Sequence, residues 1–398
     1  MIHPIRKTLV TAMLAGFAIT AHAADGPTVT VSGFGTAALT MTDNDNAEFI
    51  RPNQAAGAGE DVTAGVDSIF GIQATAKMSD RLSLTAQGLA RRQQRGHFGA
   101  ELAWAFAKFK ATDKLDVRVG RMGLPVYMIS DFRNVGYANT MLRPPAEVYR
   151  QVTADSFDGA DLVYQDTFGE TTVTAQLAFG RTTSKTPNNV NVVFKPLTAL
   201  HIVAEHGPMS FRFGRADADF SIENNTTLDG LVATLRQVGL TQPANDIAAK
   251  DVRGSFTSLG YTLDYKNVLV QAEYAVRKTD TRTVHDTTSY YAMLGYRFGK
   301  ITPFYYYGNI KQDDARTYAG LPTTGPLAPL TAGVNSVVKA ALQSTNALGV
   351  RWDFSKSAAL KVQVDHVSPK DGPGAFINAK PGFAGPVNVY AAGIDFVF

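Results

Sequence analysis

Cysteine is absent from the 398-residue sequence, and tryptophan occurs only twice. Without cysteine the chain cannot form disulfide bonds, so packing and hydrogen bonding must supply its stability. Long hydrophobic runs are also missing after residue 23, since no later stretch approaches the roughly 18 apolar residues of a membrane-spanning helix. A chain of this kind is either soluble or crosses a bilayer by the other available route, a closed β-barrel.

Residues 1–23 have the three-part layout of a secretory signal. Arg6 and Lys7 form the positive start, an apolar run follows over residues 9–19, and the segment ends in Ala-His-Ala, a typical cleavage pattern. The apolar run is too short for a spanning helix. We therefore expect cleavage after Ala23 and a mature chain of residues 24–398.

A strong excess of either charge is lacking as well. The precursor has 38 basic and 35 acidic residues, and the loss of Arg6 and Lys7 leaves 36 against 35. A nearly neutral mature chain gives no argument for a nucleic-acid partner.

Strand-like segments recur along the whole mature chain. Apolar and polar side chains alternate in most of them, with the period of two that is typical of β-strands. In residues 357–368, for example, Leu360, Val362 and Val364 alternate with polar neighbours. The pattern predicts sixteen strands, near residues 28–41, 63–79, 81–94, 100–112, 114–123, 156–166, 170–181, 197–206, 209–222, 254–266, 268–280, 287–299, 301–313, 345–355, 357–368 and 386–398.

The connections between these strands fall into two length classes that alternate. Short turns follow the second, fourth and each later even-numbered strand. The other connections are mostly much longer: 42–62, 124–155, 182–196, 223–253, 314–344 and 369–385, with two short ones near 95–99 and 281–286. Tight turns at one rim and long loops at the other are typical of outer-membrane barrels. We predict an all-β fold, a transmembrane antiparallel up-and-down β-barrel with short periplasmic turns and long external loops.

The chain ends on large apolar residues at every second position, in the sequence NVYAAGIDFVF. Tyr390, Ile394, Phe396 and Phe398 would share one face of the last strand. In water such an edge strand would invite aggregation. We therefore expect lipid to cover this face, and the last strand to close the barrel against the first.

A terminal phenylalanine after alternating apolar residues resembles the signal that Gram-negative outer-membrane proteins present to their barrel-assembly machinery. With sixteen strands and this loop pattern, the whole mature chain resembles the Gram-negative porin family, whose members are typically trimeric. The resemblance implies a passive channel for small hydrophilic solutes and ions in the bacterial outer membrane, without catalysis or a cofactor. It also implies membrane lipid, lipopolysaccharide and the assembly machinery as partners, and a homotrimer as the assembly. A substrate-specific porin for small organic acids or sugars is the alternative.

The loop at residues 124–155 is too long for a simple connector and too rich in apolar anchors to be disordered. In the porin family the third external loop folds into the lumen and narrows the channel, and this loop matches it in position and length. The candidate lining and constriction residues are Arg91, Arg95 and Arg118 from the strands and Asp131, Arg133, Arg143 and Glu147 from the loop. Arginines that face carboxylates would orient permeating solutes, and the surplus of arginine weakly favours anions.

Two arginines have an equally good structural interpretation. Arg143 and Arg121 both lie next to tight backbone, where they could tie the loop to the wall by pairing with carboxylates or carbonyls. A bulge near Gly120 would also change the face on which Arg121 lies, so its direction is left open. The connection at residues 95–99 looks too short to reach a neighbouring subunit. The small outer faces of the first strands, with Ala37, Ala86, Gly88, Ala103 and Ala105, could form the interface instead.

Other features are weaker. Within the loop at 223–253, apolar residues at helical spacing predict a helix that either restricts the barrel mouth or packs on neighbouring loops. No spacing typical of a metal site appears. His366 and Ser368 share an outward face, as the site of an outer-membrane phospholipase would require, but Asp365 points the other way. Nucleophilic catalysis needs a residue that orients the histidine. We therefore expect no enzymatic activity.

Overall fold

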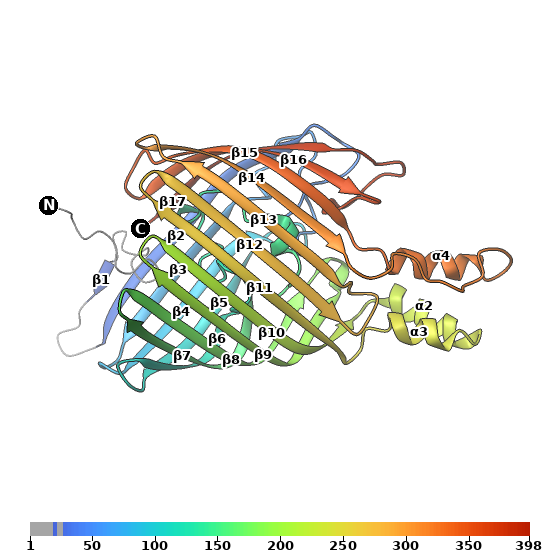
Figure 1. Cartoon of the computed structure of the whole chain (residues 1–398), viewed down its shortest axis with the longest axis horizontal. Coiled ribbons are helices and arrows are strands. Elements are labelled where there is room, and N and C mark those ends of the chain that lie inside the picture. The colour runs from blue at the N-terminus through green and yellow to red at the C-terminus, as the bar shows by residue number, and fades with distance from the viewer. Residues whose placement is uncertain (1–18, 22–26) are drawn as a thin grey trace.

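The computed structural model describes residues 19–21 and 27–398, and its main body is a closed antiparallel barrel (Figure 1). Every strand from β2 to β17 pairs with its sequence neighbours, and β17 pairs with β2 to complete the circle. The sixteen strands are β2 (Thr28–Thr42), β3 (Ile69–Lys77), β4 (Leu82–Arg92), β5 (Phe98–Lys110), β6 (Leu115–Gly123), β7 (Ser156–Phe168), β8 (Thr171–Lys185), β9 (Asn191–His206), β10 (Met209–Glu223), β11 (Val252–Tyr265), β12 (Val268–Thr279), β13 (Thr287–Tyr296), β14 (Ile301–Gln312), β15 (Leu342–Trp352), β16 (Ala358–Lys370) and β17 (Val387–Val397). The predicted fold class is confirmed.

The largest differences from the predicted strand boundaries are at the starts of β3 and β9. β3 begins at Ile69, because residue Thr63 forms only an isolated bridge with Thr40. β9 begins at Asn191, although Pro196 has no amide hydrogen to donate. A bulge accommodates this proline: the pairing of β9 with both β8 and β10 shifts register beside it, so the long strands continue to the outer rim.

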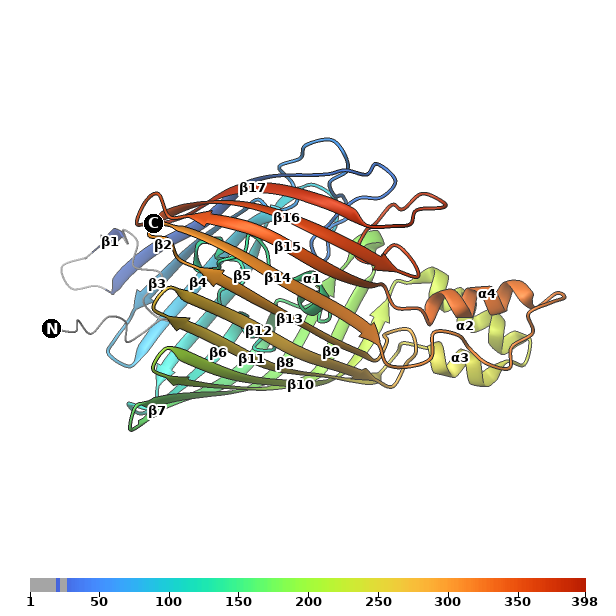
Figure 2. The same ribbon diagram turned by 45° about the horizontal axis from the view of Figure 1, so that its top comes forward.

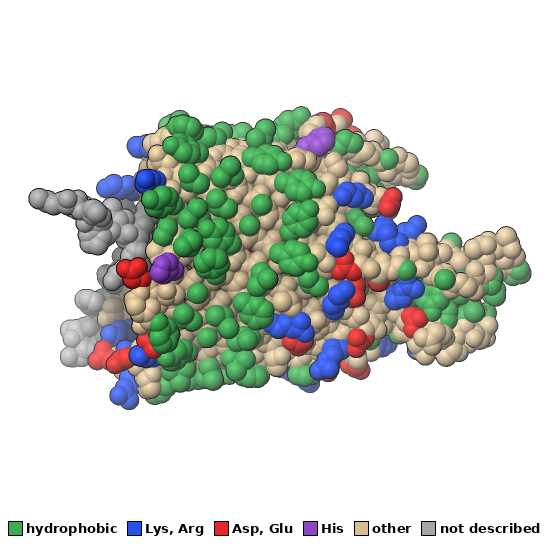
Figure 3. Space-filling model, in the orientation of Figure 1, with side chains coloured by type: hydrophobic (Ala, Val, Ile, Leu, Met, Phe, Trp, Pro, Cys, Tyr) green, Lys and Arg blue, Asp and Glu red, His purple; other side chains and the backbone are tan. Residues whose placement is uncertain are grey.

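The last strand has the predicted facing. On β17, Tyr390 and Ile394 are 41% and 44% exposed on the outer wall, whereas Asp395 is fully buried toward the lumen. The strand ends in a backbone contact, in which the amide of Gly33 donates to the carbonyl of Phe398 over 2.8 Å. Across the visible outer wall, apolar side chains cover the middle of the barrel, and charged ones gather toward the rim that bears the helices (Figure 3).

The two rims differ as predicted. The short turns lie at one rim with the C-terminus, and the long loops lie at the other (Figure 1). Three helices stand together beyond the long-loop rim in both ribbon views (Figure 2): α2 (Thr226–Gln237), α3 (Thr241–Ile247) and α4 (Ala328–Val337). Their shared apolar core includes Leu235, Ile247 and Val334, all fully buried. The loop at 223–253 therefore packs on another loop. We call this three-helix unit the helical cap.

Shorter elements complete the chain: η1 (Gly136–Ala138), α1 (Ala146–Tyr149) and η2 (Pro187–Asn189). Of the described helices, none has the length and hydropathy needed to cross a bilayer. The predicted signal lies outside the described residues except for β1 (Ile19–Ala21), which pairs antiparallel with Val29–Val31. Cleavage after Ala23 stays a prediction.

Candidate functional site

The loop at 124–155, called L3 here, lies inside the barrel. Its apolar residues form the centre of the largest buried cluster, where the ring of Tyr127 lies 4.6 Å from Tyr149 of the same loop and 5.2 Å from Phe256 of β11. Gly214 of β10 lets the loop approach closely, since a Cβ at this position would lie 2.7 Å from the carbonyl oxygen of Val126. The predicted inward fold of this loop therefore has direct structural support.

Polar side chains on the inner wall fasten the backbone of L3 to consecutive strands. Glu273 of β12 accepts from the amide of Met128 over 2.9 Å and from the hydroxyl of Tyr149 over 2.6 Å. On β16, Gln363 accepts from the amide of Leu142 over 3.0 Å, and the ammonium of Lys361 donates to the carbonyl of Gly136 over 2.8 Å. L3 thus covers the wall formed by β11 to β17 and leaves the opposite wall free.

Arg143 is an anchor of L3 and not a free lining residue. Its guanidinium donates to Asp67 over 3.0 and 2.8 Å and to Asp365 over 2.6 Å, and all three side chains are at most 5% exposed. The group also lies over the ring of Phe49 at 4.8 Å. Asp67 belongs to the first long loop and Asp365 to β16, so one buried cation joins two loops and the wall. The structural interpretation of Arg143 is the correct one.

Glu147 was predicted to line the constriction, and this prediction is wrong. The side chain is 2% exposed on α1 and turns toward β15, where it accepts hydrogen bonds from Gln343 over 2.7 Å and Thr345 over 2.5 Å. Burial raises the pKa of Glu147 above its usual value. The apolar residues on either side of Glu147 pack L3 against the wall, and Glu147 is buried with them. The loop sequence alone does not reveal that burial.

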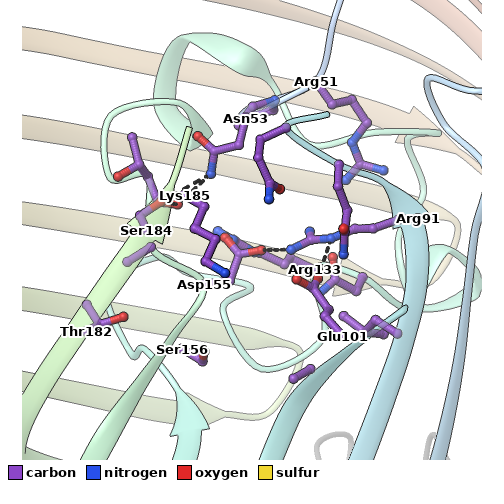
Figure 4. Close-up of a pocket in the computed structure, with 18 of the residues that line it drawn as sticks. Arg51, Asn53, Arg91, Glu101, Arg133, Asp155, Ser156, Thr182, Ser184 and Lys185 are labelled. Atoms are coloured by element: carbon purple, nitrogen blue, oxygen red, sulfur yellow. Dashed lines mark hydrogen bonds and ion pairs between the residues drawn. The ribbon is translucent and has the colours of Figure 1, made fainter. Parts of the chain in front are cut away.

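A cavity of about 940 Å³ lies on the free side of L3. Residues of the first loop, β4, β5, L3 and the outer ends of β8 to β10 line it (Figure 4). The lining contains nine basic and seven acidic residues: Arg51, Arg91, Arg92, Arg121, Arg133, Arg143, Arg181, Lys185 and Lys195 against Glu101, Asp131, Asp155, Asp158, Asp219, Glu223 and Asp251. Charges of both signs surround this space, with a small positive surplus.

Arg91 and Arg133 meet at one carboxylate in this cavity (Figure 4). Arg91 donates to Asp155 over 2.6 Å and to Glu101 over 2.7 Å, and Arg133 pairs with the second oxygen of Asp155. Burial lowers the pKa of Arg133 to about 10, which still leaves the group charged at neutral pH. The predicted roles of Arg91 and Arg133 fit this position, and Asp131 also lines the cavity.

Arg51 is a lining residue that the sequence did not reveal. It comes from the first long loop, and among the described residues its guanidinium has no ion-pair or hydrogen-bond partner of its own. Burial lowers its pKa, with Arg91 and Arg143 adding to the effect. Its neighbour Asn53 donates to the carbonyl of Thr153 in L3 over 2.8 Å, which holds the two loops together. Only the folding of one loop onto another brings Arg51 here.

Arg95 and Arg118 do not line this cavity. Arg95 is exposed in the turn between β4 and β5, where no strand directs its side chain inward. Arg118 does face the lumen, but a two-pronged pair with Asp161, at 2.8 and 2.5 Å, satisfies it. Asp161 is buried and also accepts from Gln176 over 2.7 Å.

Arg121 faces outward. Gly120 has a positive φ of 135°, yet the pairing of β6 with β5 and β7 continues through it without a shift of register. In the strand register, Arg121 lies opposite Ala105 of β5 and Asp158 of β7, and it pairs with Asp158 over 2.7 and 2.8 Å. The possible bulge near Gly120 is therefore absent from the pairing of β6, and the regular alternation places Arg121 on the same outer face as Val119.

The outward histidine also has a partner that the sequence did not suggest. His366 contacts the side-chain oxygen of Asn388 over 2.8 Å, and Asn388 donates to Asp43 over 2.6 Å. Among the described residues, no hydrogen bond joins His366 to Ser368, and no cluster of three or more potential ligands could hold a metal ion.

A model of the Gram-negative porins matches residues 10–372 of the sequence. The chain belongs to the Gram-negative porin family. It is therefore an outer-membrane channel of a Gram-negative bacterium, as the terminal strand and loop pattern predicted. No curated protein matches the sequence.

Solved structures share the fold of this porin at low sequence identity. An anion-selective porin from Comamonas acidovorans is 15% identical, with 94% of this chain and 100% of that chain covered and a TM-score of 0.56. OmpF of Salmonella typhi, in complex with daunomycin, is 14% identical, with 96% and 100% covered and a TM-score of 0.58. A trimer form of OmpT from Vibrio cholerae is 15% identical, with 94% and 100% covered and a TM-score of 0.54. At these identities the likeness establishes the fold alone.

Proposed function

We propose that this porin lets small hydrophilic solutes and ions diffuse across the outer membrane with a weak preference for anions. The preference rests on the group of Arg51, Arg91 and Arg133. In the described part of the chain, the carboxylates paired with this group are Glu101 and Asp155. Fixed guanidinium groups in a narrow, low-dielectric space raise the local concentration of anions. The carboxylates nearby keep the preference weak.

Reversal potentials across a potassium chloride gradient test this proposal. In planar bilayers, we expect discrete open steps and a reversal potential on the chloride side. Arg51→Gln should shift the potential toward potassium without loss of folding, because Arg51 holds no partner in place. Arg95→Gln is the matched control, since it removes the same charge from an exposed turn. A potassium-selective wild type, or equal shifts in both variants, would contradict the proposal.

A substrate-specific porin for small organic acids is the second candidate. Arginine presents planar, paired donors that match carboxylate geometry, and Arg51 lies next to the amide of Asn53 and opposite the hydroxyl of Ser184 (Figure 4). Such a site would make a di- or tricarboxylate reduce the chloride current at submillimolar concentration. A chloride current that no organic acid reduces would favour a general diffusion porin over a substrate-specific one.

We also propose that the chain is exported, inserted into the outer membrane and assembled into trimers, as its family resemblance implies. The signal would be cleaved after Ala23, the barrel-assembly machinery would recognise the terminal Phe398, and lipid with lipopolysaccharide would surround the outer wall. Three copies would associate through the small apolar faces of β2 to β6. Ala103 does not belong to that surface, since it packs inside against Phe34 and Leu89. We propose neither a cofactor nor catalysis.

A further inference from the structure

The barrel closes at a seam between its last strand, β17, and its first strand, β2 (Figure 1). Among the sixteen strands of the described barrel, this is the neighbouring pair that no turn or loop connects. Elsewhere the chain itself limits how far two strands can slip past each other. At the seam the register depends on side chains and backbone hydrogen bonds alone. In the structure, Phe396 lies opposite Gly35 and Ile394 lies opposite Ala37.

Two glycines of β2 lie directly under aromatic rings of β17. Gly35 faces Phe396, and Gly33 exchanges two backbone hydrogen bonds with Phe398, over 2.8 and 2.9 Å. A Cβ on either glycine would overlap the ring opposite it. Both glycines are therefore buried, although their strand positions belong to the outer face. The ring of Phe398 also reaches across β2 to Phe70 of β3, on which it stacks with 6.3 Å between the ring centroids.

Small side chains face large ones along most of the outer side of the seam. From the short-turn rim upward, the opposed pairs are Gly33 with Phe398, Gly35 with Phe396, Ala37 with Ile394, Leu39 with Ala392 and Met41 with Tyr390. Such complementary sizes fill the space between two strands evenly. A slip by two residues keeps every side chain on its face, but it sets Phe396 against Ala37 or Ile394 against Gly35. The first arrangement forces a ring against a methyl group, and the second leaves a glycine partly uncovered.

The register at the seam also affects the width of the barrel. In a closed barrel, the number of strands and the stagger of their hydrogen bonds together determine the tilt and the diameter. With the other pairings unchanged, a slip of β17 along β2 changes the total stagger and hence the diameter. The width of the channel thus depends on side chains that lie outside it.

We propose that Gly33 and Gly35 fix the closing register of the barrel by accommodating the rings of Phe398 and Phe396, and so set the width of the channel. The two glycines are positioning residues, since neither lines the cavity of the described chain. This role of the rings is separate from recognition by an assembly machinery, because the contact lies within the folded chain.

One contact on the inner face of the seam favours the same register. The hydroxyl of Thr36 donates to the carboxylate of Asp395 over 2.5 Å. These two residues are direct partners in the pairing of β2 with β17. Loss of the glycines should therefore loosen the register without abolishing it.

Disulfide trapping measures the register directly, because the natural chain has no cysteine. Opposed residues of an antiparallel pair lie about 5.5 Å apart at Cα, within reach of a disulfide, whereas diagonal neighbours lie about 7–8 Å apart. Ala37→Cys with Ile394→Cys should therefore link in the refolded porin, and Ala37→Cys with Ala392→Cys should not. Adding Gly33→Ala and Gly35→Ala should lower the linked fraction of the first pair by about threefold. A linked chain is nearly circular and migrates faster on a denaturing gel without reductant.

Gly88→Ala is the matched control. Gly88 lies on β4, and a Cβ at this position would meet its nearest atoms at 3.9 Å, which is an ordinary contact. The substitution adds the same methyl group to the same small-residue outer face, so linkage should not change. Single-channel recording gives a second readout. We expect one conductance amplitude for the wild type and for Gly88→Ala, and several amplitudes for the chain that carries Gly33→Ala and Gly35→Ala.

Two results would overturn the proposal. One is undiminished linkage between positions 37 and 394 in the double glycine variant, and the other is a single wild-type conductance in that variant. Should the double variant fail to refold, Phe396→Ala provides the test, because it removes a ring and adds no bulk. In detergent micelles without assembly machinery, Phe396→Ala should also lower the linkage, whereas a residue that serves recognition alone would leave it unchanged. Neither readout depends on ion preference, so these outcomes are independent of the proposed function.

Discussion

L3 and the helical cap are both long loops with short helices, yet one lies inside the barrel and the other outside. L3 meets a wall that presents buried hydrogen-bond partners, such as Glu273, Lys361 and Gln363, to its backbone. The helical cap has its own apolar core, and its backbone amide and carbonyl groups are hydrogen-bonded within its helices. The comparison indicates that L3 can lie in the lumen because the barrel wall supplies hydrogen-bond partners for its backbone. The helical cap can stand outside because its own helices supply these partners.

Breaking the main anchor of L3 should have the largest effect. Arg143→Met removes the cation between Asp67 and Asp365 and leaves two buried carboxylates with neutral hydrogen-bond donors but without a cation. Loss of one member of a buried pair costs about 3–5 kcal/mol. We expect a lower urea midpoint and a larger, noisier single-channel conductance as L3 loosens. Arg236→Met is the control, because within the described residues Arg236 makes one exposed hydrogen bond, to Asn245 in the helical cap. An unchanged urea midpoint would mean that the other contacts are sufficient to hold L3 in place without Arg143.

A cavity in the helical cap should unfold the cap without changing the channel. Leu235 is fully buried in α2, and Leu235→Ala costs about 2–4 kcal/mol at such a site. Because no residue of α2, α3 or α4 lines the cavity of the described chain, conductance should stay the same. Limited proteolysis of the loop at 223–253 should become faster in the same sample. Faster cleavage together with altered conductance would show that the two regions are coupled.

Acidic pH should loosen the helical cap slightly. His285 contacts the carbonyl of Val337 over 2.9 Å at the base of α4, and burial lowers the pKa of its ring. A histidine whose folded pKa is lowered stabilises the fold above its unfolded pKa of about 6.5, and this contribution falls as the pH drops below that value. Hydrogen exchange of residues 328–338 should therefore increase from pH 7.5 to 5.5, and His285→Gln should remove the dependence.

The strand pattern predicted the barrel because alternation is a local property. The predicted facing of Leu360, Val362 and Val364 requires only that every second side chain points the same way, and each of their polar neighbours lies toward the lumen. The inward fold of L3 followed from its length and apolar residues together with the family resemblance. The candidate site was predicted less well. Arg91, Arg133 and Asp131 line the cavity, and Arg118 faces the lumen but is paired with Asp161. Arg95 and Glu147 do not line it.

The partners of the charged side chains were not predictable from the sequence, for one physical reason. A strand position fixes the side of the wall on which a side chain lies, but not the partner it finds there. Arg118 finds Asp161, 43 residues away, and Arg143 finds Asp365, 222 residues away. Such pairs depend on the register of several strands and on the path of a loop, which no local pattern encodes.

By itself the sequence determined the strand number, the facing of most side chains, the two rims and the membrane class, because each follows from short-range periodicity and from the length of connections. Only the tertiary structure decided which charges remain free in the cavity and that Arg51 joins them. Both depend on how the loops fold onto one another, because a charged group stays available to solutes only when no group close to it in space has already paired with it.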